Sequence, residues 1–348
     1  MDYLINTPDL QQPVLAALSA FPWPSEDAER PAALLARCPA AAVTPLAEAP
    51  ALARRAGVGR VDIKDERGRM GLGSFKALGA AYVIAHDAEA GKARGQTYVT
   101  ASAGNHGMSV AAGATAFGAK AVVYIAETVP ETFADRLRAQ GAEVRREGTI
   151  YEESMAAAAK AAEDNGWALL SDSSWPGYTD RPHRLMEGYL VLMQEAAGQI
   201  AAPPTHLFLQ AGVGGLAAAA ACHARKLWGS APRIIVVEPE YAPAIIGSMR
   251  LGHAGSFPGP ASDMGRLDCK EPSQIALKGL ARDADIFMTI TEAEGAEGAR
   301  VAEEIGLPST PSGAAGLAGL LAASSARGAF GLDDSARVML ILSEGPAA

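Results

Sequence analysis

The sequence has few cysteines, and they follow no recognisable pattern. Cys38, Cys222 and Cys269 are the only three among 348 residues, and they lie far apart. An odd number at such spacing predicts neither a disulfide framework nor a zinc site, and favours a reducing, cytoplasmic setting. The first ten residues also lack a basic segment followed by an apolar one, so we expect no secretory signal.

Long apolar runs and excess positive charge are missing as well. The alanine-rich stretch 216–222 is too short to cross a bilayer. The formal net charge of −9 argues against non-specific binding to nucleic acid or to anionic membranes. With 49% hydrophobic and 20% charged residues, the composition is that of an ordinary large globular protein. Its length corresponds to about two domains.

Strand-like and helix-like segments alternate along most of the chain. We expect arm and loop structure with one helix in residues 1–60, and a loop-rich section after residue 237. The predicted strands are 61–66, 98–100, 121–125, 142–144, 167–171, 206–210, 233–237, 286–290 and 338–342. The predicted helices are 31–37, 77–89, 107–117, 130–140, 152–165, 182–197, 214–228, 272–281, 292–305 and 313–323. Such alternation predicts an α/β fold with parallel sheets and right-handed crossovers. Pro203-Pro204 marks a seam between two such blocks.

One lysine stands at an unusual place in this pattern. The stretch Gly71–Gly79 follows an extended segment and opens a helical run, with Ser74 as a plausible N-cap. Lys76 is therefore expected in the first turn of a helix. The positive end of the helix dipole disfavours a cation there and lowers the lysine pKa, as a Schiff-base lysine requires. The alternative is a solvated surface lysine.

A second stretch with candidate site residues lies at the end of the predicted strand 98–100. Ser102, Ala103, Gly104 and His106 surround Asn105 in a turn that opens a helix. Small residues give access to backbone N–H groups at a helix start, which suits a carboxylate. Asn105 adds a side-chain amide, and His106 is a candidate to brace the loop. An ordinary strand–helix turn is the alternative.

A glycine-rich turn, Gly212-Val213-Gly214-Gly215-Leu216, follows the strand 206–210. Its backbone is suited to hold a phosphate at a helix start. The same turn also fits the dinucleotide fingerprint G-x-G-x-x-A, with Glu238 placed as a ribose-binding acid. A nicotinamide-dependent oxidoreductase is therefore a competing hypothesis, although it leaves Lys76 and the Asn105 turn unexplained. Ser343, after the last strand, offers a hydroxyl for a ligand ring nitrogen.

Taken together, these motifs resemble the tryptophan-synthase-β-like group of pyridoxal-phosphate enzymes, called fold type II. The resemblance covers the chain from about residue 60 to its end. It implies that Lys76, preceded by Phe75, forms a Schiff base with pyridoxal 5'-phosphate. It assigns the phenolic oxygen of the cofactor to Asn105 and the pyridine nitrogen to Ser343. The phosphate is assigned to Gly212, Val213, Gly214, Gly215 and Leu216. The substrate carboxylate is assigned to Ser102, Ala103, Gly104 and His106.

The resemblance also implies an overall organisation. We expect two domains, each with a mostly parallel sheet flanked by helices. Residues 1–86 and 199–348 form the large cofactor-binding domain, and residues 87–198 form the small substrate-side domain. A homodimer is expected from the family. The partners we expect are a small amino-acid substrate, with no nucleic acid, no membrane and no metal site.

Within the group, the sequence is most similar to diaminopropionate ammonia-lyases. The similarity lies in 63–66 with Gly71-Leu72, in 175–178 running to 186–189, and in 268–273. That family usually has an acid at the position of Ala103, implicated in handling the D-substrate. Asp172 matches a second family acid, although a turn or N-cap acid is the alternative reading. The resemblance therefore favours elimination on L-2,3-diaminopropionate, which yields a 2-oxo acid and ammonia.

A second substrate class remains open from the sequence. The form Ser-Ala-Gly-Asn-His-Gly at 102–107 resembles the serine and threonine dehydratases, which expel hydroxide from the β-carbon. The predicted activity is thus α,β-elimination from a small amino acid. Diaminopropionate is the first candidate and a β-hydroxy amino acid the second.

Overall fold

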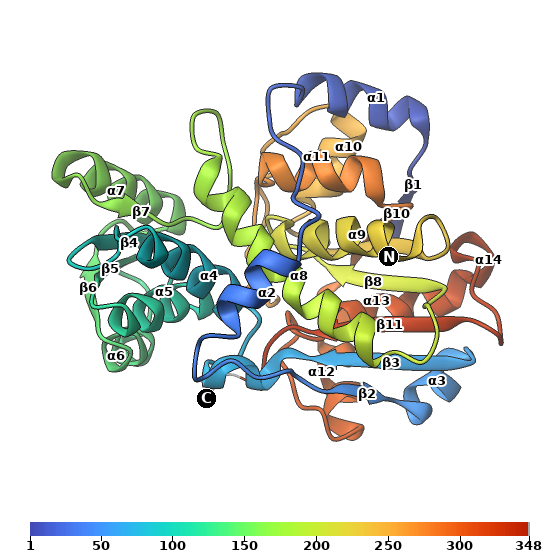
Figure 1. Ribbon diagram of the computed structural model, residues 1–348. Coiled ribbons are helices and arrows are strands. Elements are labelled where there is room, and N and C mark those ends of the chain that lie inside the picture. Colours follow the sequence, from blue (N-terminus) through green and yellow to red (C-terminus); the bar gives the residue numbers. More distant parts are fainter. Residues whose placement is uncertain (347–348) are drawn as a thin grey trace.

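Two sheets of mostly parallel strands organise the chain (Figure 1). The computed structural model describes residues 1–346. The larger sheet has seven strands. In spatial order these are β1 (Asp2–Ile5), β10 (Ile286–Ile290), β9 (Arg233–Pro239), β8 (His206–Gln210), β11 (Arg337–Leu342), β3 (Arg60–Asp65) and β2 (Leu46–Glu48). The outer strands β1 and β2 pair antiparallel, and the others pair parallel.

The smaller sheet is parallel throughout. Its four strands, in spatial order, are β6 (Ala142–Arg146), β5 (Lys120–Ile125), β4 (Thr97–Ala101) and β7 (Ala168–Leu169). The α/β fold with parallel-dominated sheets is therefore confirmed. The strands of the larger sheet lie within residues 1–86 and 199–348, and those of the smaller sheet lie within residues 87–198. The exact division at residues 86 and 198 stays a prediction.

Helices cover both sheets. They are α1 (Pro8–Ala17), α2 (Glu29–Leu35), α3 (Pro50–Ala56), α4 (Lys76–Glu89), α5 (Asn105–Ala116), α6 (Glu131–Ala139), α7 (Tyr151–Asn165), α8 (Asp180–Gln199), α9 (Gly215–Trp228), α10 (Ala244–Leu251), α11 (Gln274–Asp283), α12 (Glu292–Glu304), α13 (Ala315–Ala323) and α14 (Arg327–Phe330). Two 3₁₀ turns, η1 (Glu66–Gly71) and η2 (Ser324–Ala326), complete the elements.

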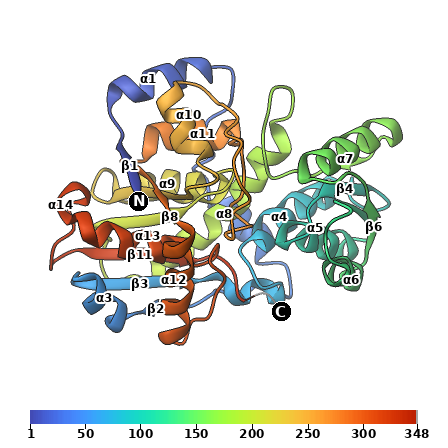
Figure 2. The same cartoon turned by 180° about the vertical axis from the view of Figure 1, so that it is seen from behind.

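The larger sheet is buried on both faces, as its sequence predicts. In β9, Ile234 and Val236 belong to one apolar cluster, while Ile235 and Val237 belong to another. Side chains alternate between faces along a strand, so a run apolar at every position fits a sheet with helices on both sides. Seen from behind, α12 and α13 cover the second of these faces (Figure 2).

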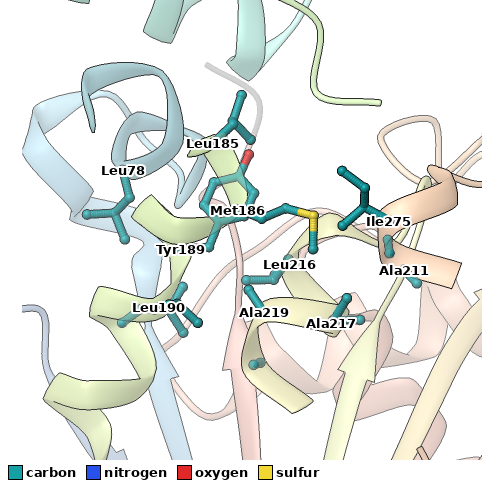
Figure 3. Close-up of a cluster of buried hydrophobic side chains, with 14 of the residues drawn as sticks. Leu78, Leu185, Met186, Tyr189, Leu190, Ala211, Leu216, Ala217, Ala219 and Ile275 are labelled. Atoms are coloured by element: carbon teal, nitrogen blue, oxygen red, sulfur yellow. The ribbon is translucent and has the colours of Figure 1, made fainter. Parts of the chain in front are cut away.

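Helix α8 joins the two halves of the molecule through its packing on α4 and α9. Leu185, Met186 and Tyr189 of α8 lie between Leu78 of α4 and Leu216 of α9 (Figure 3). The helices α4 and α8 cross closely. A Cβ built on Gly188 would lie 3.0 Å from the Cα of Gly79 and 2.6 Å from the carbonyl oxygen of Leu78. The crossing therefore requires glycine at both positions.

Several local predictions were wrong or incomplete. Residues 1–60 contain α1, α3, β1 and β2 in addition to the expected helix, and α10 lies in the section expected to be loop-rich. Strand β7 is shorter than the predicted 167–171. Ser74 does not cap a helix: Phe75 is the N-cap residue, and the Ser74 hydroxyl is buried without a hydrogen-bond partner within residues 1–346. Ser74 instead forms a β-bridge with Glu344.

None of the helices in residues 1–346 has the length and apolar character needed to traverse a bilayer.

Candidate active site

Lys76 is the first residue of α4, and its side chain meets Asp172. The loop before α4 is held in place by the Phe75 N–H, which donates to the Ser343 carbonyl oxygen at 3.0 Å. The Lys76 ammonium donates to the Asp172 carboxylate in a short ion pair. The pair joins the start of α4 to the loop after β7, so it links the two sheets.

The ion pair with Asp172 shifts the pKa of Lys76 in the direction opposite to the one expected from the sequence. Burial lowers the pKa of Lys76, but the opposite charge of Asp172 outweighs it, and the pKa of Lys76 is raised. The predicted lowering was wrong because the dipole of α4 is a smaller effect than an ion pair at contact distance. Burial alone would raise the pKa of Asp172, yet the charge of Lys76 lowers it. Both groups are therefore charged at neutral pH.

The Asn105 turn lies beside this pair. Helix α5 begins at Asn105, with Gly104 as its N-cap residue, and the Gly104 N–H donates to the Ser102 hydroxyl at 3.2 Å. The imidazole Nε2 of His106 lies 2.8 Å from the Leu170 carbonyl oxygen. Burial lowers the pKa of His106, which favours the neutral ring. His106 therefore braces the turn against the end of the small sheet.

Glu344 is a site residue that sequence reasoning missed. Its carboxylate accepts hydrogen bonds from the Asn105 amide and from the Thr310 hydroxyl. Arg266 Nε lies 3.6 Å from Glu344 Oε2. Glu344 is 4% exposed, and burial raises its pKa. The available signal was its position next to Ser343, at the carboxyl end of β11.

The glycine turn after β8 has the geometry of an anion site. Gly214 has φ +94°, and a Cβ there would lie 2.7 Å from Ile245 Cδ1, so only glycine fits. The N–H groups of Gly215 and Leu216 belong to the first turn of α9 and have no carbonyl partner within the helix. Such free N–H groups and the helix dipole attract a phosphate.

These elements enclose one cavity of about 610 Å³. The cavity is lined by all of the residues named as candidates from the sequence: Phe75, Lys76, Ser102, Ala103, Gly104, Asn105, His106, Asp172, Gly212, Val213, Gly214, Gly215, Leu216 and Ser343. Also in its wall are residues that were not predicted, among them Tyr151, Arg266, Cys269 and Glu344. A primary amine, a side-chain amide and an anion-binding helix start meet here. They fit the aldehyde, phenolic oxygen and phosphate of pyridoxal phosphate.

The dinucleotide reading of the glycine turn fails on Glu238. This residue is fully buried, and its carboxylate accepts the backbone N–H groups of Ile245 at 2.7 Å and Ile246 at 2.8 Å. Both carboxylate oxygens are committed to the start of α10, so Glu238 cannot reach a ribose. Within residues 1–346, no group of three or more potential ligands is arranged to hold a metal ion.

A buried ionic cluster supports the segment that leads to Lys76. Lys64 donates to Glu195 at 2.7 Å, and Arg69 contacts both Glu195 and Glu66. Lys64 and Glu66 are fully buried. They therefore belong to a buried structural element and not to a solvated strand end. Through Glu195, the cluster fastens β3 and η1 to α8.

Comparison with known proteins agrees with this geometry. The family model described as pyridoxal-phosphate dependent enzyme matches residues 38–344, so the chain belongs to that family and its cofactor is pyridoxal 5'-phosphate. Within the family it falls among the ammonia-lyases. It is 34% identical to diaminopropionate ammonia-lyase from Salmonella typhimurium over 294 residues, which cover 76% of this chain and 73% of that protein.

Two further comparisons extend this result. L-threonine ammonia-lyase from Thermotoga maritima is 28% identical over 225 residues, covering 65% of this chain and 53% of that protein. The crystal structure of diaminopropionate ammonia-lyase from Escherichia coli, in complex with an aminoacrylate–pyridoxal-phosphate azomethine reaction intermediate, superposes with a TM-score of 0.86. It is 28% identical and covers 99% of this chain and 94% of that one. The expected fold type and enzyme class are thus confirmed.

Proposed function

We propose that the protein eliminates the β-amine of L-2,3-diaminopropionate, with release of a 2-oxo acid and two molecules of ammonia. The observation that carries this proposal is the contact between Lys76 and Asp172 in the cavity wall. A carboxylate at that place attracts a β-ammonium group, whereas the β-hydroxyl of serine or threonine carries no charge to attract. The relatives named diaminopropionate ammonia-lyase point to the same substrate.

The residues of the cavity divide the work. Bound pyridoxal phosphate supplies the electron sink for the negative charge that develops at Cα. Lys76 is the base that takes the α-proton, and Asp172 orients Lys76 and the leaving β-amine. The turn Ser102–His106 holds the substrate carboxylate, and the glycine turn 212–216 holds the cofactor phosphate. Asn105 and Ser343 are assigned to the phenolic oxygen and the ring nitrogen.

The proposed preference for the L-isomer rests on Ala103 and Asp172, the two positions at which the resemblance to diaminopropionate ammonia-lyases implies an acid. Ala103 lines the cavity but has no group that can accept a proton. At the second position, Asp172 does supply a carboxylate to the cavity. The Escherichia coli enzyme has been solved in complex with D-serine. A chain with Ala103 lacks the acid assigned to D-substrates, so we infer that it acts on the L-isomer.

A β-hydroxy amino acid dehydratase is the second candidate. The turn Ser-Ala-Gly-Asn-His-Gly and the similarity to an L-threonine ammonia-lyase support it. Loss of hydroxide needs an acid at the β-oxygen. Asp172 is the acid beside Lys76, so a dehydratase would need Asp172 to carry a proton when the β-oxygen leaves, which a β-ammonium group does not require.

We also propose that the enzyme is a cytoplasmic homodimer with a large domain of residues 1–86 and 199–348 and a small domain of residues 87–198. Free thiols at Cys38, Cys222 and Cys269 are consistent with a reducing compartment. Light scattering coupled to size-exclusion chromatography measures the assembly, and a single-chain mass would contradict the dimer.

A substrate panel tests the activity. Purified enzyme is supplied with pyridoxal phosphate and with L- and D-diaminopropionate, L-serine or L-threonine, and ammonia and 2-oxo acid are measured. We expect L-diaminopropionate to have the highest kcat/KM. Faster turnover of serine or threonine would establish the dehydratase instead.

A further inference from the structure

Arg266 reaches from a loop of the large-sheet half to the substrate side of the cavity. The loop is anchored by the Arg266 backbone N–H, which donates to the Ser312 hydroxyl at 3.1 Å. The guanidinium lies 5.9 Å from the centre of the Phe133 ring in α6. It also rests against the backbone of Gly104, where a built Cβ would lie 2.5 Å from Arg266 Nη1. The absence of a side chain at Gly104 makes room for this approach.

The guanidinium of Arg266 is only partly engaged. Its single ion contact is the 3.6 Å approach of Nε to Glu344, and within residues 1–346 its Nη1 and Nη2 groups have no hydrogen-bond acceptor. The side chain is 30% exposed. A guanidinium has five N–H donors in a planar fork. Arg266 therefore offers free donors to the cavity.

The other cations of the cavity are committed. Lys76 is paired with Asp172. Lys270 donates to the carbonyl oxygens of Tyr241 and Pro260 at 2.8 Å each, and to the Asp268 carboxylate. Arg266 is thus the cavity cation with unused donors, and it lies directly over the turn to which the proposed function assigns the substrate carboxylate.

We propose that Arg266 binds the α-carboxylate of the amino-acid substrate, together with the backbone of the turn 102–106. The inference rests on the proposed function only for the place of the carboxylate. A planar fork matches the two oxygens of a carboxylate and fixes its orientation. Arg266 then selects ligands with a free carboxylate and sets the angle at which Cα faces Lys76. Glu344 accepts a hydrogen bond from Asn105 and lies 3.6 Å from Arg266 Nε, so it lies between the cofactor side and the substrate side of the cavity.

The test compares two ligands that lack a β-leaving group. L-alanine has a free carboxylate, and L-alaninamide has a neutral amide at the same place. Each is titrated into the cofactor-loaded enzyme, and the dissociation constant is read from the visible absorbance of the cofactor. Loss of a hydrogen-bonded charge corresponds to about a ten- to hundredfold change in binding. We expect R266A to raise the dissociation constant of L-alanine by that factor and to leave the dissociation constant of L-alaninamide unchanged.

Two further variants sharpen the experiment. R266K keeps the charge but not the fork, and we expect an intermediate dissociation constant for L-alanine. Arg136 lines a neighbouring cavity that Arg266 also borders, but not the site cavity. R136A removes the same charge nearby and should leave both ligands unaffected. An equal effect of R136A and R266A would mean a general field effect and would overturn the proposal.

The remaining outcomes are equally decisive. The proposal fails if R266A weakens both ligands alike, or if the wild-type enzyme binds L-alanine no more tightly than L-alaninamide. Neither ligand can undergo β-elimination, so the titration does not depend on which β-group the enzyme expels. Failure to release ammonia from diaminopropionate would therefore contradict the proposed function and leave the role of Arg266 standing.

Discussion

The ammonium group of Lys76 forms an ion pair with the carboxylate of Asp172, although 96 positions separate the two residues in the chain. The contact exists because α4 begins at the carboxyl edge of the large sheet and Asp172 follows the last strand of the small one. While the Lys76 amine is free, each group favours the charged form of the other: the pKa of Lys76 is raised and that of Asp172 is lowered.

Replacing Asp172 tests this pair. In D172N, Lys76 loses its counter-ion and the leaving amine loses its orienting acid. We expect kcat for L-diaminopropionate to fall by about 10²- to 10⁴-fold, while the visible absorbance of the cofactor persists. Borohydride reduction should label Lys76 in both proteins. Wild-type kcat in D172N would show that the carboxylate plays no part in elimination.

The hydrogen bond between Glu344 and Asn105 predicts an energetic coupling. Both E344A and N105A should weaken cofactor binding, measured as the dissociation constant of pyridoxal phosphate. Because the two side chains are in direct contact, the double variant should lose less than the sum of the single losses, by about 0.5–3 kcal/mol. Strictly additive losses would mean that Glu344 does not act through Asn105.

The glycine turn predicts a sharp difference between two alanine substitutions. G214A places a Cβ 2.7 Å from Ile245 at a φ of +94° and should abolish cofactor loading. Gly198, near the end of α8, has no atom within 4 Å of a built Cβ and is the matched control. G198A should load cofactor normally. Equilibrium dialysis measures both, and normal loading of G214A would exclude the turn as the phosphate site.

The buried cluster around Glu195 predicts a large stability effect. E195A leaves Lys64 and Arg69 without a shared counter-ion in a buried place, which costs about 3–5 kcal/mol. The urea midpoint of unfolding should fall accordingly. Glu89 forms an ion pair with Arg37 at the exposed surface, so E89A should hardly change the midpoint. Equal midpoints for the two variants would contradict the assignment of the cluster as a structural support.

Glu238 predicts a pH dependence of stability. Burial raises its pKa to about 8, an effect that the hydrogen bonds from Ile245 and Ile246 offset only in part. The usual value is 4.5, so between these values the native state binds a proton that the unfolded state has released. This contribution to stability is complete below pH 4.5 and disappears as the pH rises through 8.

The variant E238Q removes this titration. Its urea midpoint should decline less than that of the wild type between pH 5 and pH 9, so the gap between the two proteins narrows as the pH rises. A constant gap across that range would show that Glu238 does not titrate there.

Much of the fold was predictable because each strand and helix carries its own periodic pattern. The strands at 206–210 and 286–290 lie where predicted, since their apolar runs are bounded by turn residues. The elements of residues 1–60 were missed because Pro and Ala obscure any period there. Helix α10 was missed because Pro243 and Gly252 sit at its two ends, where they resemble loop signals.

The candidate residues of the site could be named because each lies in a short motif next to a strand end. The pKa of Lys76 could not be predicted in direction, because its partner comes from a distant loop. The roles of Glu344 and Arg266 could not be predicted from the sequence for the same reason. Their importance lies in what they touch, and Arg266 sits in an irregular segment without a motif. Contacts between loops depend on how the two sheets are placed, and no local pattern encodes that placement.

The close crossing of α4 and α8 has a consequence for the reactive amine. Gly79 is three residues after Lys76, about one helical turn, and its Cα meets Gly188 with no room for a side chain on either. We expect a methyl group at this crossing to push the start of α4 outward and to carry the Lys76 nitrogen away from the turn assigned to the cofactor phosphate. The chemistry of the cavity is thus set in part by two hydrogen atoms at the crossing of α4 and α8, one helical turn beyond the reactive amine.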